Sequence, residues 1–96
     1  MKNVLIVGNS YSLTKKLLSY GDNVFVAPGN DQIAKITKCI DIRNSIELLS
    51  FAVENNIDLA IVISDFDDVV SIFQANEKLV FGGNFLNYAQ GKKFLY

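Results

Sequence analysis

Residues able to bind a phosphate group follow the first apolar run of the chain. The run from Val4 to Val7 is followed by Gly8, Asn9 and Ser10 and then by a helical pattern. Backbone amides at the start of a helix, together with serine hydroxyls, are donors that suit phosphate oxygens. Only one glycine is present at this turn, so the spacing is not that of a G-x-G-x-x-G dinucleotide site. Two interpretations stay open: a phosphate site, or a tight strand-to-helix turn with capping hydroxyls.

A second turn of the same kind follows the next apolar run. The run Val24 to Ala27 ends in Pro28, Gly29 and Asn30. Proline presets a turn and the next two residue types tolerate positive φ, so this tripeptide is also typical of a turn with no further role. In open parallel sheets, ligands bind beyond the carboxyl ends of the strands. Both turns are therefore candidate binding loops.

The composition limits the chemistry that these loops can do. The 96 residues include no histidine and one cysteine, Cys39. The commonest general base and the commonest metal ligand are thus missing, and no internal disulfide can form. We predict no catalytic residue and no metal site in this chain. For Cys39, beside the apolar Ile40, we favour a buried structural thiol over a reactive one.

The size and charge of the chain indicate its class. Nine basic and ten acidic residues give a net charge of −1. A chain without excess positive charge lacks the electrostatic attraction that binds nucleic acids or anionic membranes. The apolar runs are far shorter than the roughly 20 residues that span a bilayer. The length fits one domain, residues 1–96. We expect a single cytoplasmic domain with neither a nucleic-acid nor a membrane partner.

Strands and helices are predicted to alternate along the chain. Continuous apolar runs indicate strands buried on both faces, as in a parallel sheet covered by helices. Short links and right-handed crossovers then predict an α/β domain with a five-stranded parallel Rossmann-like sheet and helices on both faces. Strands are expected at 4–7, 24–27, 38–40, 57–63 and 79–81, and helices at 13–20, 44–55, 69–73 and 84–90. The piece at 33–36 is expected to be either weakly helical or irregular. On the helix at 44–55, the apolar face is expected to hold Ile46, Leu49, Ala52 and Val53.

The sequence resembles the N-terminal domain of phosphoribosylamine-glycine ligase (glycinamide ribonucleotide synthetase), an enzyme of the ATP-grasp superfamily. The segment from Val24 to Asn30, VFVAPGN, is very similar to the second-strand motif of that family. The residues from Ile40 to Val62 follow the order of its third strand, second helix and fourth strand, and Phe81-Gly82 stands at its Phe-Gly. The resemblance covers nearly the whole chain. It implies a pre-ATP-grasp domain, with the ATP-grasp and C-terminal domains expected to lie outside these residues.

The resemblance also implies an activity. The family uses ATP and Mg²⁺ to join glycine to 5-phosphoribosylamine in de novo purine biosynthesis, and its N-terminal domain helps to hold the phosphoribosyl substrate. ATP and Mg²⁺ would bind mainly on the other domains, so the isolated chain is expected to be inactive. Its partners would be phosphoribosylamine or its ribonucleotide product, and the remaining domains. The resemblance assigns substrate binding to seven residues of three loops: Gly8, Asn9 and Ser10 at the ribose phosphate, Pro28, Gly29 and Asn30 along the adjacent wall, and Asp65 near the amine.

The loops of this chain depart from the family pattern. The first loop is shorter than the glycine-rich loop of the family, and Ser64-Asp65-Phe66 replaces its Gly-Pro-Glu. A fold survives such changes more readily than a substrate site does. Two alternatives therefore stay open beside the ligase domain. One is a non-catalytic, diverged Rossmann-like binding or interaction module, and the other is the equivalent domain of another ATP-grasp ligase.

Overall fold

The structure is a computed structural model that describes residues 2–63, 67–76 and 80–82. Its strands form one sheet of order β3-β2-β1-β4-β5, in which every pairing is parallel. The predicted α/β class and parallel sheet are confirmed. In chain order the elements are β1 (Asn3–Val7), α1 (Tyr11–Ser19), β2 (Asn23–Ala27), α2 (Asp31–Ala34), β3 (Lys38–Cys39), α3 (Ser45–Glu54), β4 (Leu59–Val62), α4 (Asp67–Ala75) and β5 (Val80–Gly82).

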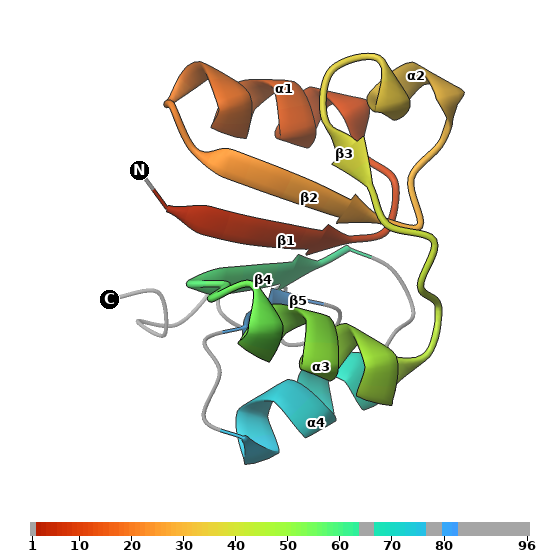
Figure 1. The fold of residues 1–96 in the computed structure, drawn as a ribbon, viewed down its shortest axis with the longest axis vertical. Helices are drawn as coiled ribbons and strands as arrows, with labels where there is room; N and C mark the ends of the chain where they lie inside the picture. The colour runs from red at the N-terminus through yellow and green to blue at the C-terminus, as the bar shows by residue number, and fades with distance from the viewer. Residues whose placement is uncertain (1, 64–66, 77–79, 83–96) are drawn as a thin grey trace.

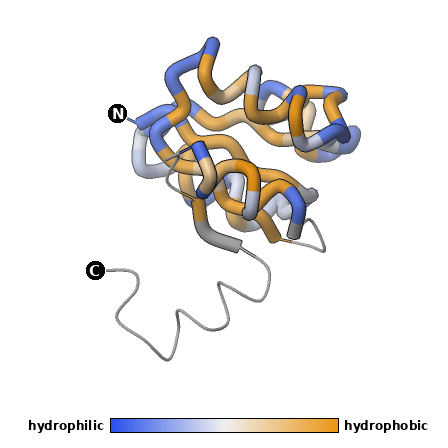
Figure 2. The backbone as a smooth tube through the Cα atoms, turned by 90° about the horizontal axis from the view of Figure 1, so that it is seen from below, coloured by the Kyte–Doolittle hydropathy of each residue, from blue (hydrophilic) through white to orange (hydrophobic). Residues whose placement is uncertain are grey.

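Helices cover both faces of the sheet, as the sequence predicts. Helices α1 and α2 lie on one face and α3 and α4 on the other (Figure 1). Buried apolar residues form one core on each side of the sheet, and much of the backbone tube in Figure 2 has the colour of hydrophobic residues. In the central strand β1, Leu5 and Val7 belong to the core under α3 and α4, whereas Val4 and Ile6 belong to the core under α1 and α2. Because side chains of a strand alternate between the two faces, a strand covered on both sides must be apolar throughout.

Helix α1 begins and ends at the predicted signals. The hydroxyl of Ser10 caps its start by accepting from the amide of Leu13. Its end is followed by Gly21, whose φ is +87° and whose N–H donates to the carbonyl of Leu18 at 3.0 Å. Thr14 is fully buried, and its hydroxyl donates to the carbonyl of Ser10 at 2.7 Å. The helix thus leaves no unpaired side-chain group against the sheet.

The predicted apolar face of α3 is partly wrong. Leu48 and Ala52 are the fully buried residues of this helix, whereas Ile46 is 63% and Val53 is 55% exposed. Leu48 and Ala52 are four residues apart and therefore share one face of a helix. Since α3 carries apolar residues all round, periodicity alone does not determine which face meets the sheet. Asn44 caps the start as expected, its side-chain oxygen accepting from Glu47 at 3.2 Å.

Side-chain hydrogen bonds join three strands at the amino edge of the sheet. The amide of Asn3 donates to the carboxylate of Asp58 at 2.8 Å. The side chain of Asn3 donates to the carbonyl of Asn56 at 3.1 Å and accepts from Asn23 at 3.1 Å. These contacts fix the starts of β1, β2 and β4 to one another. This group of hydrogen bonds lies at the edge of the sheet opposite to the candidate loops.

Some predictions fall outside the described residues. These are the helix at 84–90 and the candidate site residue Asp65. None of the helices within the described ranges combines the length and the apolarity needed to cross a membrane.

Candidate functional site

The two predicted loops meet at the carboxyl edge of the sheet. Strands β1 and β2 are paired in register up to Val7 and Ala27, so they end at the same level. Directly beyond them, the N–H of Gly8 donates to the carbonyl of Ala27 at 2.7 Å. This bond extends the ladder by one residue beyond β1, into the first loop. Residues 8–10 and 28–30 therefore lie next to each other, in the place where ligands bind to sheets of this type.

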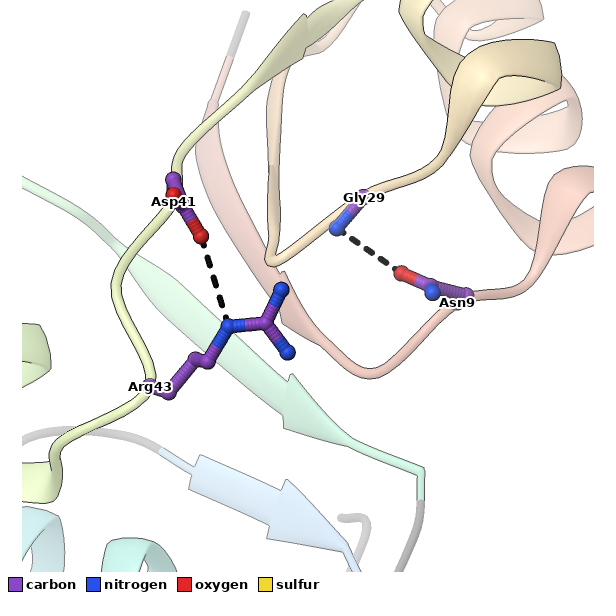
Figure 3. Close-up of polar contacts among 4 residues, drawn as sticks. All are labelled: Asn9, Gly29, Asp41 and Arg43. Carbon is purple, nitrogen blue, oxygen red and sulfur yellow. Dashed lines mark hydrogen bonds and ion pairs between the residues drawn. The ribbon is translucent and has the colours of Figure 1, made fainter.

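One side-chain hydrogen bond ties the two loops together. The amide of Gly29 donates to Oδ1 of Asn9 at 2.8 Å (Figure 3). Since Oδ1 accepts, the NH₂ group of Asn9 is turned away from Gly29 and presents two N–H donors. No described residue accepts a hydrogen bond from this group. Asn9 thus both joins the loops and offers donors at the edge.

Gly29 occupies a position that only glycine can take without strain. Its φ is +84°, and a Cβ atom there would overlap Sγ of Cys39 and lie 2.5 Å from its Cβ. The close approach comes from β3, which pairs Cys39 with Val26 of β2. The sequence analysis favoured a buried thiol for Cys39, but this residue is only half-buried. It lies directly beneath the second loop. The peptide bond between Ala27 and Pro28 is cis.

Two candidate site residues act as helix caps. The hydroxyl of Ser10 accepts from Leu13 at 3.3 Å, and Oδ1 of Asn30 accepts from Ile33 at 2.9 Å. The capping interpretation of the first turn is therefore confirmed for Ser10. Capping does not occupy the first backbone amides of α1, which have no partner within a helix. A ligand at this edge would meet those amides and the side chain of Asn9.

A third segment crosses the same edge, and it was missed in the sequence. Residues 40–44 lead from β3 to α3, past the carboxyl ends of the strands (Figure 1). The N–H of Ile40 donates to the carbonyl of Val26 at 2.7 Å, which fixes the start of the segment at the end of β2. Within it, Nε of Arg43 donates to the carboxylate of Asp41 at 3.3 Å, and both side chains are largely exposed. The position of this segment follows from the topology: β3 ends at the carboxyl edge, and α3 begins on the opposite face of the sheet.

The described residues offer no metal chemistry. No group of three or more His, Cys, Asp or Glu residues lies close enough together to hold a metal ion within residues 2–63, 67–76 and 80–82. Asp65, the remaining candidate, lies outside these ranges. The arrangement around Asn9 and Gly29 can bind an anion through N–H donors. It presents no described nucleophile beside a general base.

Comparison with known proteins identifies relatives of the chain. No protein-family model matches it. It is 35% identical over 91 residues to the phosphoribosylamine-glycine ligase of Fusobacterium nucleatum, covering 84% of this chain and 21% of that enzyme. It is also 35% identical over 66 residues to the phosphoribosylamine-glycine ligase of Clostridium acetobutylicum, covering 64% of this chain and 16% of that enzyme. These matches confirm the resemblance seen in the sequence, and the chain spans about a fifth of the length of the curated relatives it matches.

The bond between Asn9 and Gly29 leads to a prediction. In Asn9→Ala, the N–H of Gly29 loses its acceptor, so we expect the free energy of unfolding to fall by about 1 kcal/mol. Amide hydrogen exchange at Gly29 should become faster than in the unmodified protein. The amides of β1 should keep the same ranking of exchange rates among themselves. Asn9→Asp is the control, because it keeps an acceptor oxygen of the same reach. Unchanged exchange at Gly29 in Asn9→Ala would contradict the coupling of the two loops.

Proposed function

From the relationship of this chain to the phosphoribosylamine-glycine ligases, we propose that it is the N-terminal, pre-ATP-grasp domain of such an enzyme. The observation that carries the proposal is the match to the Fusobacterium nucleatum ligase over 84% of the chain. The parallel sheet with helices on both faces is consistent with it. The whole enzyme would join glycine to 5-phosphoribosylamine at the expense of ATP, in the purine biosynthesis of the cytoplasm.

The role of this domain in the proposal is to hold the phosphoribosyl part of the substrate. A phosphate group needs several N–H donors, and helix starts supply them. The first loop, residues 8–10, leads into α1 at the carboxyl edge, and Asn9 adds the donors of its side chain. The second loop, residues 28–30, would form the adjacent wall of the site. The hydrogen bond from the N–H of Gly29 to Asn9 holds this loop against the first one. Asp65 would lie near the reacting amine.

ATP, Mg²⁺ and glycine are assigned to other domains of the enzyme. The described residues do not fit a magnesium site, because no three metal-ligating side chains come together among them. In the proposed reaction, ATP would phosphorylate the carboxylate of glycine and leave as ADP, and the amine of the sugar phosphate would then attack the acyl phosphate, forming the amide bond and releasing inorganic phosphate. This domain would bind and orient the sugar phosphate for that attack. We therefore expect no ligase turnover from the 96 residues alone.

A titration followed by NMR tests the binding role. Uniformly ¹⁵N-labelled protein is titrated with ribose 5-phosphate, and in parallel with ribose, which lacks the phosphate. We expect saturable shifts of the amides at 8–10 and 28–30 with ribose 5-phosphate and none with ribose. An absence of shifts at millimolar ribose 5-phosphate would overturn the binding role. It would favour a diverged Rossmann-like module that keeps the sheet without the site.

A further inference from the structure

We propose that Arg43 binds the phosphate group of the substrate at the carboxyl edge. The inference rests on the proposed function, because it names the side chain that recognises the phosphate at that same site. It concerns a segment, residues 40–44, to which the sequence analysis assigned no binding role. The argument depends on where this segment runs, on the charges of the surrounding loops and on the geometry of the guanidinium group.

The path of the chain places Arg43 at the edge. Ile40 is fixed beside the end of β2 by its hydrogen bond to Val26 at 2.7 Å. Asn44 caps α3, which lies on the face of the sheet opposite to α1 and α2. Arg43 is therefore the residue before the helix cap, at the end of a connection from β3 to α3. This connection passes the carboxyl ends of the central strands (Figure 1). Figure 3 shows its guanidinium group projecting from this segment toward the side where Asn9 and Gly29 meet.

Arg43 is the cationic side chain of the three described loops, at 8–10, 28–30 and 40–44, and Asp41 is their acidic one. Lys16 lies in the last turn of α1, at the other end of that helix from the 8–10 loop, and Lys38 of β3 is level with Phe25, the middle residue of β2. Neutral N–H donors alone bind a phosphate dianion less strongly than donors that include a charged one. Arg43 would therefore strengthen a phosphate site built on these loops.

The ion pair leaves most of the guanidinium group available. Asp41 accepts from Nε at 3.3 Å, and the four N–H groups on the two Nη atoms have no described partner. These groups form a planar fork that matches two oxygens of a phosphate. The side chain of Arg43 is 72% exposed, so a ligand can reach it. Together with the NH₂ group of Asn9, the fork would approach the phosphate from the side opposite to α1.

The test compares three variants in the same titration with ribose 5-phosphate. In Arg43→Gln we expect the Kd to rise by at least about tenfold, which is the loss of one charge-assisted, forked contact. Arg43→Lys should fall between this variant and the unmodified protein, because it keeps the charge without the fork. Lys16→Gln is the matched control: it removes one exposed positive charge from the other end of α1 and should leave the Kd unchanged.

The outcomes separate the inference from the proposed function. If the unmodified protein binds ribose 5-phosphate and Arg43→Gln binds it equally well, the role of Arg43 is overturned and the site stands. An equal loss in Arg43→Gln and Lys16→Gln would also overturn it, because the effect would then be one of net charge. If the unmodified protein shows no binding, the proposed function fails and this inference fails with it. The urea midpoint of Arg43→Gln, expected to be unchanged, shows that the variant is folded.

Discussion

Gly29→Ala is expected to lower the free energy of unfolding by about 2–4 kcal/mol. Two separate effects combine at this position. The φ of +84° is strained for any residue with a Cβ atom, and the new methyl group would overlap the side chain of Cys39. Relief requires the loop at 28–30 to move away from β3, which also breaks its bond to Asn9. Urea unfolding followed by circular dichroism measures the loss.

The chain contains a matched control for this variant. Gly21 has a φ of +87°, and a Cβ atom added there would meet nothing within 4 Å. Gly21→Ala should therefore show the backbone strain alone, about 1–2 kcal/mol. Adding Cys39→Ala to Gly29→Ala should recover part of the difference, because the sulfur is then removed. Equal losses in Gly21→Ala and Gly29→Ala would contradict the close packing of Cys39 against the loop.

Phe73→Ala is expected to cost about 3–5 kcal/mol of unfolding free energy. Phe73 is fully buried in the core between the sheet and the helices α3 and α4. Its removal leaves a cavity in a domain whose total stability is expected to be about 5–15 kcal/mol. The melting temperature should fall by more than 10 °C, at roughly 4–8 °C per kcal/mol. Differential scanning calorimetry measures the change.

Val53→Ala provides the comparison for Phe73→Ala. Val53 lies on α3 with 55% of its side chain exposed, so little apolar surface is lost. Its replacement should change the stability by less than about 0.5 kcal/mol. If Val53→Ala were as harmful as Phe73→Ala, the orientation of α3 described above would be wrong. The same pair thus tests the core and the correction to the predicted helix face.

The fold was predictable because its strongest signals are local. The apolar runs of β1, β2 and β4 have no polar interruption, which is typical of strands covered on both faces. Caps and turns such as Ser10, Gly21 and Asn44 then fix where the helices begin and end. The exposed face of α3 was not predictable. Ile46 and Leu48 are both apolar, and only contacts with distant elements decide which of them is buried.

The candidate site was predictable in its position more than in its contacts. The loops at 8–10 and 28–30 follow adjacent strands, and the rule for parallel sheets places them together. That Asn9 would accept from Gly29 was not predictable, because it depends on the register of β1 with β2. The position of Arg43 and Asp41 at this edge was missed for a related reason. Residues 40–44 were assigned only to a strand end and a helix cap, and their place at the edge follows from the order of the strands.

The strand order also constrains how this chain folds during synthesis. Among the described strands, β1 is synthesised first, and its partner on one side, β2, is the next strand along the chain. Its other partner is β4, with Val4 paired to Leu59, so that side of β1 stays unpaired until β3, α3 and β4 have also left the ribosome. An apolar strand with an open edge can pair with other chains. Nascent chains halted between β3 and β4 should therefore aggregate or engage chaperones, and those that extend past Val62 should not.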